Sequence, residues 1–454
     1  MRVNPNIFKA YDIRGIYGTE LDEDIAYKIG RGFAFYLKTS PIIVGYDTRL
    51  SSSALKTALI NGLTDQGAQV VDIGLCSTPC FYFTAGNPKF AGGIMVTASH
   101  ASKEFNGFKP VSKGNTALSR EQILELKEII LKNQFTSAIK KGSITNYDPT
   151  ADYIQIVKNS IKGKFKPLKV VMDAGNGMAG LYIEKIFAET GLDIIPIYTE
   201  LSGDFPNHET NPKLPENRKK LIEKVISEKA DLGFMFDGDA DRLGIVDRRG
   251  NLFDYSLMLA LIAEYRVKNF SRKKVVIEVR TSGIVRDWVE KAGGQVEVSV
   301  CWTIPIKLKM QADPEIIFGG ETSGHCVFPE LQAADDGLFA ALTFLQAISA
   351  KDELIDEIIE NFRKKYYVLD ETNFKIENMS KADHILAKIK ANCMAQGAEI
   401  KEIDGVSAIF PGWWFNLRKS ESEPVIRLNL EAGNKKLFEE KSAEMISLIN
   451  SWIK

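Results

Sequence analysis

The chain has 454 residues, of which 44% are hydrophobic and 26% are charged, as in ordinary folded proteins. Its 58 Lys and Arg residues nearly balance its 59 Asp and Glu residues. The sequence therefore lacks the positive field that proteins use to bind nucleic acids or anionic membranes. The length exceeds what one hydrophobic core supports and predicts roughly three or four domains.

The sequence shows neither targeting nor membrane-spanning segments. The opening stretch "MRVNPNIFKAYDIRG" lacks the apolar core of a signal peptide, and the longest apolar runs are too short to cross a bilayer. The five cysteines follow no zinc or disulfide pattern. These features predict a cytoplasmic enzyme or binding protein with buried, reduced thiols, and neither a nucleic acid nor a membrane as partner.

The first predicted unit covers residues 41–74. Ile42–Val44 are typical of a buried strand, and a helical apolar pattern follows the serines at 51–53, which can cap a helix. Gly67 ends this helix, and another apolar run begins at Val70. This pattern predicts a strand–helix–strand unit, which builds a mainly parallel sheet.

The same unit recurs at residues 168–198 and 273–300. In the second copy, Val170–Met172 are the predicted strand, and Ile183 and Ile186 lie on the apolar face of the predicted helix. In the third copy, Val275–Ile277 are the strand, and Ile284 and Val285 lie on the helix. Because the spacing between copies is irregular, we interpret them as duplicated domains and not as a solenoid.

A further apolar strand follows each copy and runs into a polar loop. The three loops are "TASH" (97–100), "DGDADR" (237–242) and "GGETSGH" (319–325). Ligands of open α/β sheets bind beyond the carboxyl ends of strands, so we expect these loops to surround one cleft. Taken alone, Ser99 in the first loop is either a nucleophile or an ordinary hydroxyl at the end of a strand.

The pattern changes from about Asp370. An amphipathic helix over 381–397, a strand over 424–432 and a terminal helix over 435–454 predict a small α+β domain. Its loop "RKSESEP" clusters Arg418, Ser420 and Ser422, whose side chains suit a phosphate.

The sequence thus predicts an α/β fold around a central cleft. Three related α/β domains with mixed, mainly parallel sheets are expected at residues 1–150, 151–253 and 254–368, and a smaller α+β domain at residues 369–454. We refer to them as domains I to IV.

The loop "DGDADR" carries Asp237, Asp239 and Asp241 at every second position. Such a density of oxygen ligands suits a hard cation such as Mg²⁺. An EF-hand is excluded, because Arg242 stands where its sixth position requires glycine. The alternative is a solvated acidic turn; the crowding of three carboxylates favours the metal site.

The loop "GGETSGH" offers Glu321, Ser323 and His325 between glycines that let the backbone approach a ligand. A carboxylate, a hydroxyl and an imidazole together suit recognition of vicinal sugar hydroxyls. The alternative is a polar turn with a structural histidine. The chain has only four histidines, and two of them lie in these loops, which favours function.

In this order, "TASH…NGFK", "DGDADR", "GGETSGH" and "RKSESEP" resemble the motifs of the α-D-phosphohexomutase superfamily, in its bacterial phosphomannomutase/phosphoglucomutase branch. The resemblance extends from "FKAYDIRGIYG" through "GDFPNHETNP" to "EPVIRLNLEA". It implies a Mg²⁺-dependent mutase that interconverts hexose 1-phosphate and hexose 6-phosphate of mannose, glucose or both. One Mg²⁺ per chain and a hexose 1,6-bisphosphate intermediate belong to the same expectation.

The resemblance also implies roles for individual residues. Ser99 would carry the phosphoryl group and, with Asp237, Asp239 and Asp241, would hold the metal. The remaining matched residues are Arg14, His100, Lys109 and Arg242 around the transferred phosphoryl group; Glu321, Ser323 and His325 on the sugar; Arg418, Ser420 and Ser422 on the distal, non-reacting phosphate; and Arg280 as a further substrate-binding residue. Lys109, with a depressed pKa, and His325 are both candidates for the proton transfer.

The chain departs from the family pattern at several positions. Ala101-Ser102 replace Asn-Pro, Ala240 replaces a glycine, and Trp302-Thr303 replace a Gly-His pair or similar. Arg280 replaces a lysine and Glu421 an asparagine. Because none of these changes removes the serine or the aspartates, we expect an active mutase with altered substrate preference.

Three alternatives stay open from the sequence. They are a phosphoglucosamine or phosphopentose mutase, a catalytically silent phosphosugar-binding paralogue, and a metal-dependent phosphatase that uses only "DGDADR". The expected partner is the phosphosugar, and the expected assembly is a monomer or a weak homo-oligomer.

Overall fold

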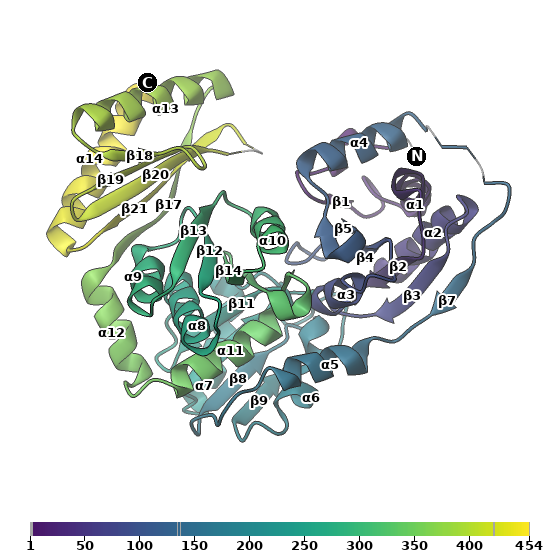
Figure 1. Ribbon diagram of the computed structural model, residues 1–454, viewed down its shortest axis with the longest axis horizontal. Coiled ribbons are helices and arrows are strands. Elements are labelled where there is room, and N and C mark those ends of the chain that lie inside the picture. Colours follow the sequence, from purple (N-terminus) through teal and green to yellow (C-terminus); the bar gives the residue numbers. More distant parts are fainter. Residues whose placement is uncertain (1–2, 134, 137, 421–422, 454) are drawn as a thin grey trace.

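The computed structural model describes residues 3–133, 135–136, 138–420 and 423–453. Its strands form separate sheets that follow one another along the chain (Figure 1). Domains I, II and III contain mixed sheets with helices packed on them, and domain IV is a β-rich unit with two long helices. The predicted α/β class, with three related domains and a smaller C-terminal one, is confirmed.

The sheet of domain I has the order β1-β5-β4-β2-β3-β7, with β6 paired to β5. Strands β4, β2, β3 and β7 run parallel, and β5 is antiparallel to both of its neighbours β4 and β1. The elements are β1 Ile13–Ile16, α1 Glu23–Leu37, β2 Ile42–Tyr46, α2 Ser52–Asp65, β3 Val70–Leu75, α3 Thr78–Ala85, β4 Gly92–Val96, β5 Phe105–Ser112, β6 Thr116–Ala117, α4 Arg120–Leu131 and β7 Ile144–Asn146.

One detail of the first repeat differs from the prediction. Ser51 precedes α2, but its side chain makes no capping hydrogen bond. Its hydroxyl accepts a hydrogen bond from Asn106 Nδ2 at 2.8 Å instead. Ser52 Oγ donates to Asp47 at 2.5 Å. These serines therefore connect α2 to β5 and to the segment after β2.

Domains II and III repeat a parallel core with antiparallel edges, in the orders β11-β10-β8-β9 and β13-β12-β14-β15-β16. Domain II contains α5 Thr150–Asn159, β8 Lys169–Asp173, α6 Ile183–Phe187, β9 Asp193–Ile197, α7 Lys219–Ser227, β10 Leu232–Phe236 and β11 Leu243–Asp247. Domain III contains α8 Tyr255–Asn269, β12 Lys274–Glu278, α9 Gly283–Lys291, β13 Gln295–Ser299, α10 Thr303–Ala312, β14 Ile316–Gly320, β15 Cys326–Phe328, β16 Ala334–Asp335, α11 Gly337–Ser349 and α12 Ile355–Lys365.

Domain IV has the antiparallel order β17-β21-β20-β19-β18. Its elements are β17 Tyr367–Lys375, α13 Met379–Ala395, β18 Glu399–Lys401, β19 Val406–Phe410, β20 Trp413–Lys419, β21 Val425–Ala432 and α14 Lys435–Ile453. The predicted division between residues 368 and 369 falls inside β17, which pairs with β21 from Tyr367 onward.

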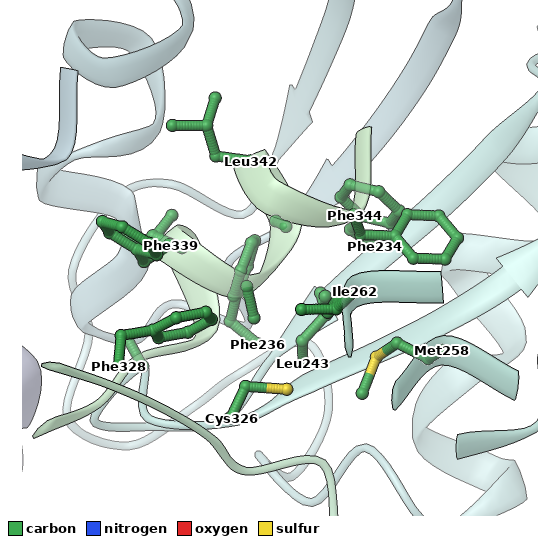
Figure 2. Close-up of a cluster of buried hydrophobic side chains, with 14 of the residues drawn as sticks. Phe234, Phe236, Leu243, Met258, Ile262, Cys326, Phe328, Phe339, Leu342 and Phe344 are labelled. Atoms are coloured by element: carbon green, nitrogen blue, oxygen red, sulfur yellow. The ribbon is translucent and has the colours of Figure 1, made fainter. Parts of the chain in front are cut away.

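One hydrophobic core runs through the three N-terminal domains and includes Phe81 of domain I, Phe234 of domain II and Phe344 of domain III. Domain I has in addition a second core of its own, which includes Phe33 and Phe108. Figure 2 shows its centre, where α11 lies against side chains from β10, β11, α8 and β15. The rings of Phe234 and Phe344 meet edge to face at 6.0 Å. Domain IV has a separate core between its sheet and the helices α13 and α14. Domains I to III are thus one packed unit to which domain IV is attached.

All five cysteines are buried and form no disulfide. Among the described helices, none combines the length and the apolar character needed to cross a membrane.

Candidate functional site

Ser99 lies in the loop after β4, at the carboxyl end of the parallel strands of domain I. It is buried and has a φ of 53°, in the left-handed region. Its N–H donates to Thr97 Oγ1 at 2.9 Å, and its Oγ donates to Asp237 Oδ2 of domain II at 2.9 Å. His100 Nδ1 lies 3.3 Å from the same hydroxyl. The local backbone thus turns the Ser99 hydroxyl toward the next domain.

Arg49 holds this loop from behind. Its guanidinium donates to the carbonyls of Ser99 at 2.8 Å, Ala101 at 2.7 Å, Ser102 at 2.8 Å and Phe105 at 3.0 Å. The side chain is fully buried. One rigid cation therefore binds four carbonyls of the chain around Ser99, and it fixes the course of the serine loop.

The loop between β10 and β11 carries Asp237, Asp239 and Asp241, all of them buried. Asp237 Oδ1 accepts the N–H groups of Asp241 at 3.1 Å and Arg242 at 3.2 Å, so the carboxylate folds the loop around itself. Ala240 takes a φ of 67° at the turn. This is the left-handed conformation in which the family glycine would be relaxed.

Groups from domain I bind the other two aspartates. Lys109 Nζ, on β5, lies 2.7 Å from Asp239 and 2.6 Å from Asp241. Thr78 Oγ1, at the start of α3, donates to Asp239 at 2.6 Å. The cluster is therefore built on the contact between domains I and II.

The aspartates fit a divalent cation. One oxygen from each of Asp237, Asp239 and Asp241 can be chosen so that all lie within 4.8 Å of one another. Asp239 Oδ1 is buried and, among the described residues, has no hydrogen-bond partner. Burial, together with the charges of Asp241 and Asp239, raises the pKa of Asp237 well above its ordinary value. A hard cation would satisfy the unpartnered oxygen and offset this repulsion.

Basic side chains lie against the aspartates next to Ser99, Lys109 against Asp239 and Asp241 and Arg242 against Asp237. Burial alone would lower the pKa of Lys109, but Asp239 and Asp241 outweigh it and raise that pKa well above the usual range. The predicted depressed pKa of Lys109 is therefore wrong, and this lysine stays charged. The positive charge of Arg242, followed by burial, holds the pKa of His100 well below its ordinary value. Arg14, on β1, pairs with Asp12 at 2.6 Å.

The domain III loop joins this cluster directly. His325 Nε2 lies 3.2 Å from Asp241, and its Nδ1 lies 2.6 Å from Glu321 Oε1. Ser323 Oγ donates to Glu321, and Thr303 Oγ1 donates to the same carboxylate at 3.0 Å. Although burial lowers the pKa of His325, Asp241 and Glu321 together raise it to about 10. The predicted sugar-binding residues are thus already hydrogen-bonded to one another.

A second cluster lies between domains III and IV. Arg280, after β12, and Arg418, on β20, both bind the carboxylate of Glu371 on β17, at 3.3 Å and 2.6 Å. Arg427 on β21 binds the other oxygen at 3.3 Å and donates to Ser420 Oγ at 3.2 Å. The predicted residue Ser422, like Glu421, lies outside the described residues.

Glu278 connects the two clusters. One of its carboxylate oxygens binds Arg280 at 2.5 Å, and the other accepts from the Thr322 N–H at 2.7 Å in the sugar loop. Arg280 and its partners in domain IV are therefore linked through Glu278 to Thr322, the neighbour of Glu321 in the sugar loop.

The sequence did not indicate Arg49, Thr78, Glu371 or Arg427. Arg427 lies in the stretch "EPVIRLNLEA" and pairs with Arg418 across β20 and β21. A second arginine on the strand next to Arg418 was the signal in the sequence that could have identified it. Arg49 and Glu371 act on groups far away in the sequence, and no local pattern marks them.

Family models described as phosphoglucomutase/phosphomannomutase α/β/α domains I, II and III match residues 5–137, 151–250 and 254–366. The chain is 37% identical to a phosphomannomutase of Vibrio cholerae over 97% of its length and 98% of that protein. It is 34% identical to a phosphoglucomutase of Neisseria gonorrhoeae, with 99% and 98% covered. A crystal structure of a phosphoglucomutase/phosphomannomutase family protein from Burkholderia thailandensis superposes with a TM-score of 0.90 at 31% identity, covering 99% and 98% of the two chains.

Proposed function

Because the chain belongs to the phosphoglucomutase/phosphomannomutase family of the α-D-phosphohexomutase superfamily and is a hexose phosphate mutase, we propose that it works through a phosphoserine at Ser99. The proposed substrates are the 1-phosphates and 6-phosphates of mannose and glucose. The observation that carries this proposal is the Ser99 hydroxyl, which lies 2.9 Å from Asp237 across the contact of two domains.

The reaction consists of two phosphoryl transfers. The Oγ–phosphorus bond of phospho-Ser99 breaks as the free hydroxyl of the hexose monophosphate bonds to phosphorus, and the hydroxyl proton passes to a base in the site. The resulting hexose 1,6-bisphosphate turns over in the cleft. Its other phosphoryl group returns to Ser99, and the product hydroxyl regains a proton.

The residues around Ser99 suit this transfer, which depends on in-line positioning and on neutralising the charge of the phosphoryl oxygens. Arg49 fixes the serine loop through four carbonyls. Lys109 and Arg242 place positive charge within the same cluster, at 2.6 Å from Asp241 and 3.6 Å from Asp237. Arg14 and His100 complete the group around the phosphoryl position.

Asp237, Asp239 and Asp241, with the phosphoryl group on Ser99, would hold one Mg²⁺. When bound, this ion supplies positive charge to the oxygens of the transferred group. The unpartnered buried Oδ1 of Asp239 supports this assignment.

Glu321, Ser323 and His325 would bind the sugar hydroxyls. Arg418, Ser420 and Ser422 would bind the non-reacting phosphate, and Arg280 is a further substrate-binding residue. Lys109 and His325 are both candidates for the proton transfer, since each lies against two carboxylates, Lys109 against Asp239 and Asp241 and His325 against Asp241 and Glu321. The predicted cytoplasmic location and assembly state stay predictions.

The decisive experiment is intact-mass measurement with peptide mapping after incubation with glucose 1,6-bisphosphate and Mg²⁺. We expect one phosphoryl group on Ser99, and neither phosphorylation nor mutase turnover in Ser99→Ala. The control Ser102→Ala should keep both. Phosphate on Ser102, or turnover by Ser99→Ala, would contradict the proposal.

The substrate range is tested by a coupled assay with mannose, glucose, glucosamine and ribose 1-phosphates. We expect the highest kcat/KM for mannose and glucose 1-phosphates and loss of turnover with excess chelator, restored by added Mg²⁺. Preference for glucosamine or ribose 1-phosphate would contradict the proposed substrates and indicate a phosphoglucosamine or a phosphopentose mutase. Release of inorganic phosphate without isomerised product would indicate a phosphatase.

A further inference from the structure

The side chain of Glu371 lies where three arginines from two domains meet. Its Oε2 accepts from Arg418 Nη2 at 2.6 Å and from Arg280 Nη1 at 3.3 Å, and its Oε1 accepts from Arg427 Nη1 at 3.3 Å. Arg418 and Arg427 belong to domain IV, whereas Arg280 belongs to domain III. One carboxylate thus orders three guanidinium groups at the domain contact.

The backbone aims Glu371 at this position through an irregularity in β17. The pairing of β17 with β21 shifts register between Leu369 and Thr372, whose partners are Leu430 and Leu428. Two residues of β17 therefore face a single residue of β21, which is the pattern of a β-bulge. Bulges occur next to active sites, where they redirect a side chain. The sheet is thus built to turn this carboxylate toward the arginines.

The arginines need a shared counter-charge. Arg418 and Arg427 stand directly opposite each other on β20 and β21. Like charges in this arrangement repel and destabilise a strand pair. Glu371 lies between them and offsets this repulsion, so the two guanidinium groups can stay close together.

The cluster keeps capacity for a further anion. Three guanidinium groups face the carboxylates Glu371 and Glu278, and Arg427 in addition meets the exposed Glu423 at 3.6 Å. The Nε atoms of Arg418 and Arg427 are buried and have no hydrogen-bond partner among the described residues. Buried donors without partners are costly, and an oxyanion would satisfy them.

We propose that Glu371 is a positioning residue for the non-reacting phosphate of the substrate. Its carboxylate gathers Arg280, Arg418 and Arg427 so that their remaining N–H groups converge on one phosphate site, and it joins domain IV to domain III at that site. This inference rests on the proposed function, since the ligand is the distal phosphate of a hexose phosphate. Glu371 itself does not contact the reacting atoms.

The test is Glu371→Gln, which keeps the shape of the side chain and removes its charge. We expect the KM for mannose 1-phosphate and glucose 1-phosphate to rise about tenfold, which corresponds to about 1.4 kcal/mol of binding. Phosphorylation of Ser99 at saturating glucose 1,6-bisphosphate should be retained, because the serine cluster is unchanged. Glu371→Asp, which restores a carboxylate, should recover most of the affinity.

The matched control is Glu423→Gln. Glu423 also faces Arg427, at 3.6 Å, but its side chain is 64% exposed and does not reach the other two arginines. We expect a wild-type KM for this variant. Urea unfolding of both variants separates a loss of substrate binding from a loss of folded protein.

An unchanged KM in a folded Glu371→Gln variant would overturn the inference. A lower KM would also overturn it, since it would mean that the carboxylate competes with the phosphate. Failure of the proposed function is a distinct result, because the wild-type enzyme itself would then show no phosphoserine.

Discussion

Trp302 has φ 85° and ψ 143°, a combination that glycine adopts without strain and a residue with a Cβ does not. Its side chain is half exposed and lies near Tyr11 of domain I, with ring centroids 6.3 Å apart. Thr303 follows it and donates to Glu321. The strained backbone of Trp302 therefore lies beside the sugar loop, and Trp302-Thr303 is one of the positions at which this chain departs from its family.

We expect Trp302→Gly to be more stable than Trp302→Ala by about 1 kcal/mol, because both variants lose the ring but only glycine relieves the backbone. Urea unfolding at equilibrium measures this difference. As a reference, Ala387→Gly on an exposed face of α13 should lose about 1 kcal/mol. Equal stability of the two Trp302 variants would contradict the assignment of strain.

Whether the sequence could predict a functional residue depended on how far along the chain its contact partners lie. Asp237, Asp239 and Asp241 are visible because they alternate within one loop, and Ser99 becomes a candidate only beside its companion loops. Arg49 binds a carbonyl 50 residues away, and Glu371 binds an arginine 91 residues away. Such contacts depend on tertiary structure, so neither residue carries a signal in its own neighbourhood.

At the scale of elements, the serine loop is fixed by one buried side chain. Replacing Arg49 with lysine keeps a positive charge but leaves three donors on a flexible stem, too few to bind all four carbonyls at once. We expect Arg49→Lys to lower kcat/KM by about a hundredfold, the scale of a misplaced reacting group. Mutase assays and urea unfolding would be compared with Arg249→Lys, an exposed arginine, which should behave as wild type. Wild-type kcat/KM in Arg49→Lys would contradict this role of Arg49.

The loop around residues 203–210 is tied to the end of β8 by His208 and Asp173, whose side chains lie 3.1 Å apart. Burial alone lowers the pKa of His208, but the hydrogen bond and charge of Asp173 outweigh it and raise that pKa. The resulting stabilisation is complete below the unfolded pKa of about 6.5 and is lost as pH rises through the folded value.

We therefore expect His208→Gln to lower the free energy of unfolding more at pH 6 than at pH 9, by about 1 kcal/mol. Urea unfolding at the two pH values measures it. In an Asp173→Asn background the pH dependence of the substitution should disappear. An equal effect of His208→Gln at both pH values would show that the pair does not stabilise the loop.

At the scale of the whole molecule, domains I to III share a core that includes Phe81, Phe234 and Phe344, and domain IV has a core of its own. The sequence predicted the domain repeats because each copy has the same apolar periodicity. It did not predict which domains share a core, because that depends on faces of helices such as α11 meeting a neighbouring sheet.

We expect domain IV to unfold first, because a small domain buries a smaller fraction of its surface. Hydrogen exchange at increasing urea should show that amides of β19, β20 and β21 lose protection before those of β8 and β10. A hexose phosphate should raise the urea concentration at which domain IV loses protection, since ligand binding stabilises the folded state. Simultaneous loss in all four sheets would contradict separate cores.

The independent core of domain IV has a consequence for enzyme engineering and for the divergence of such enzymes. A domain whose interior is self-contained can be exchanged between homologous chains without repacking the rest, whereas exchange of domain I, II or III alone would alter the core that they share. A chimera that takes its last domain from a relative would keep the serine and its aspartates intact. Its success would depend on the polar contacts that cross the junction, among them Glu371 with Arg280, Glu431 with the Gly283 N–H and Asp404 with the Cys301 N–H.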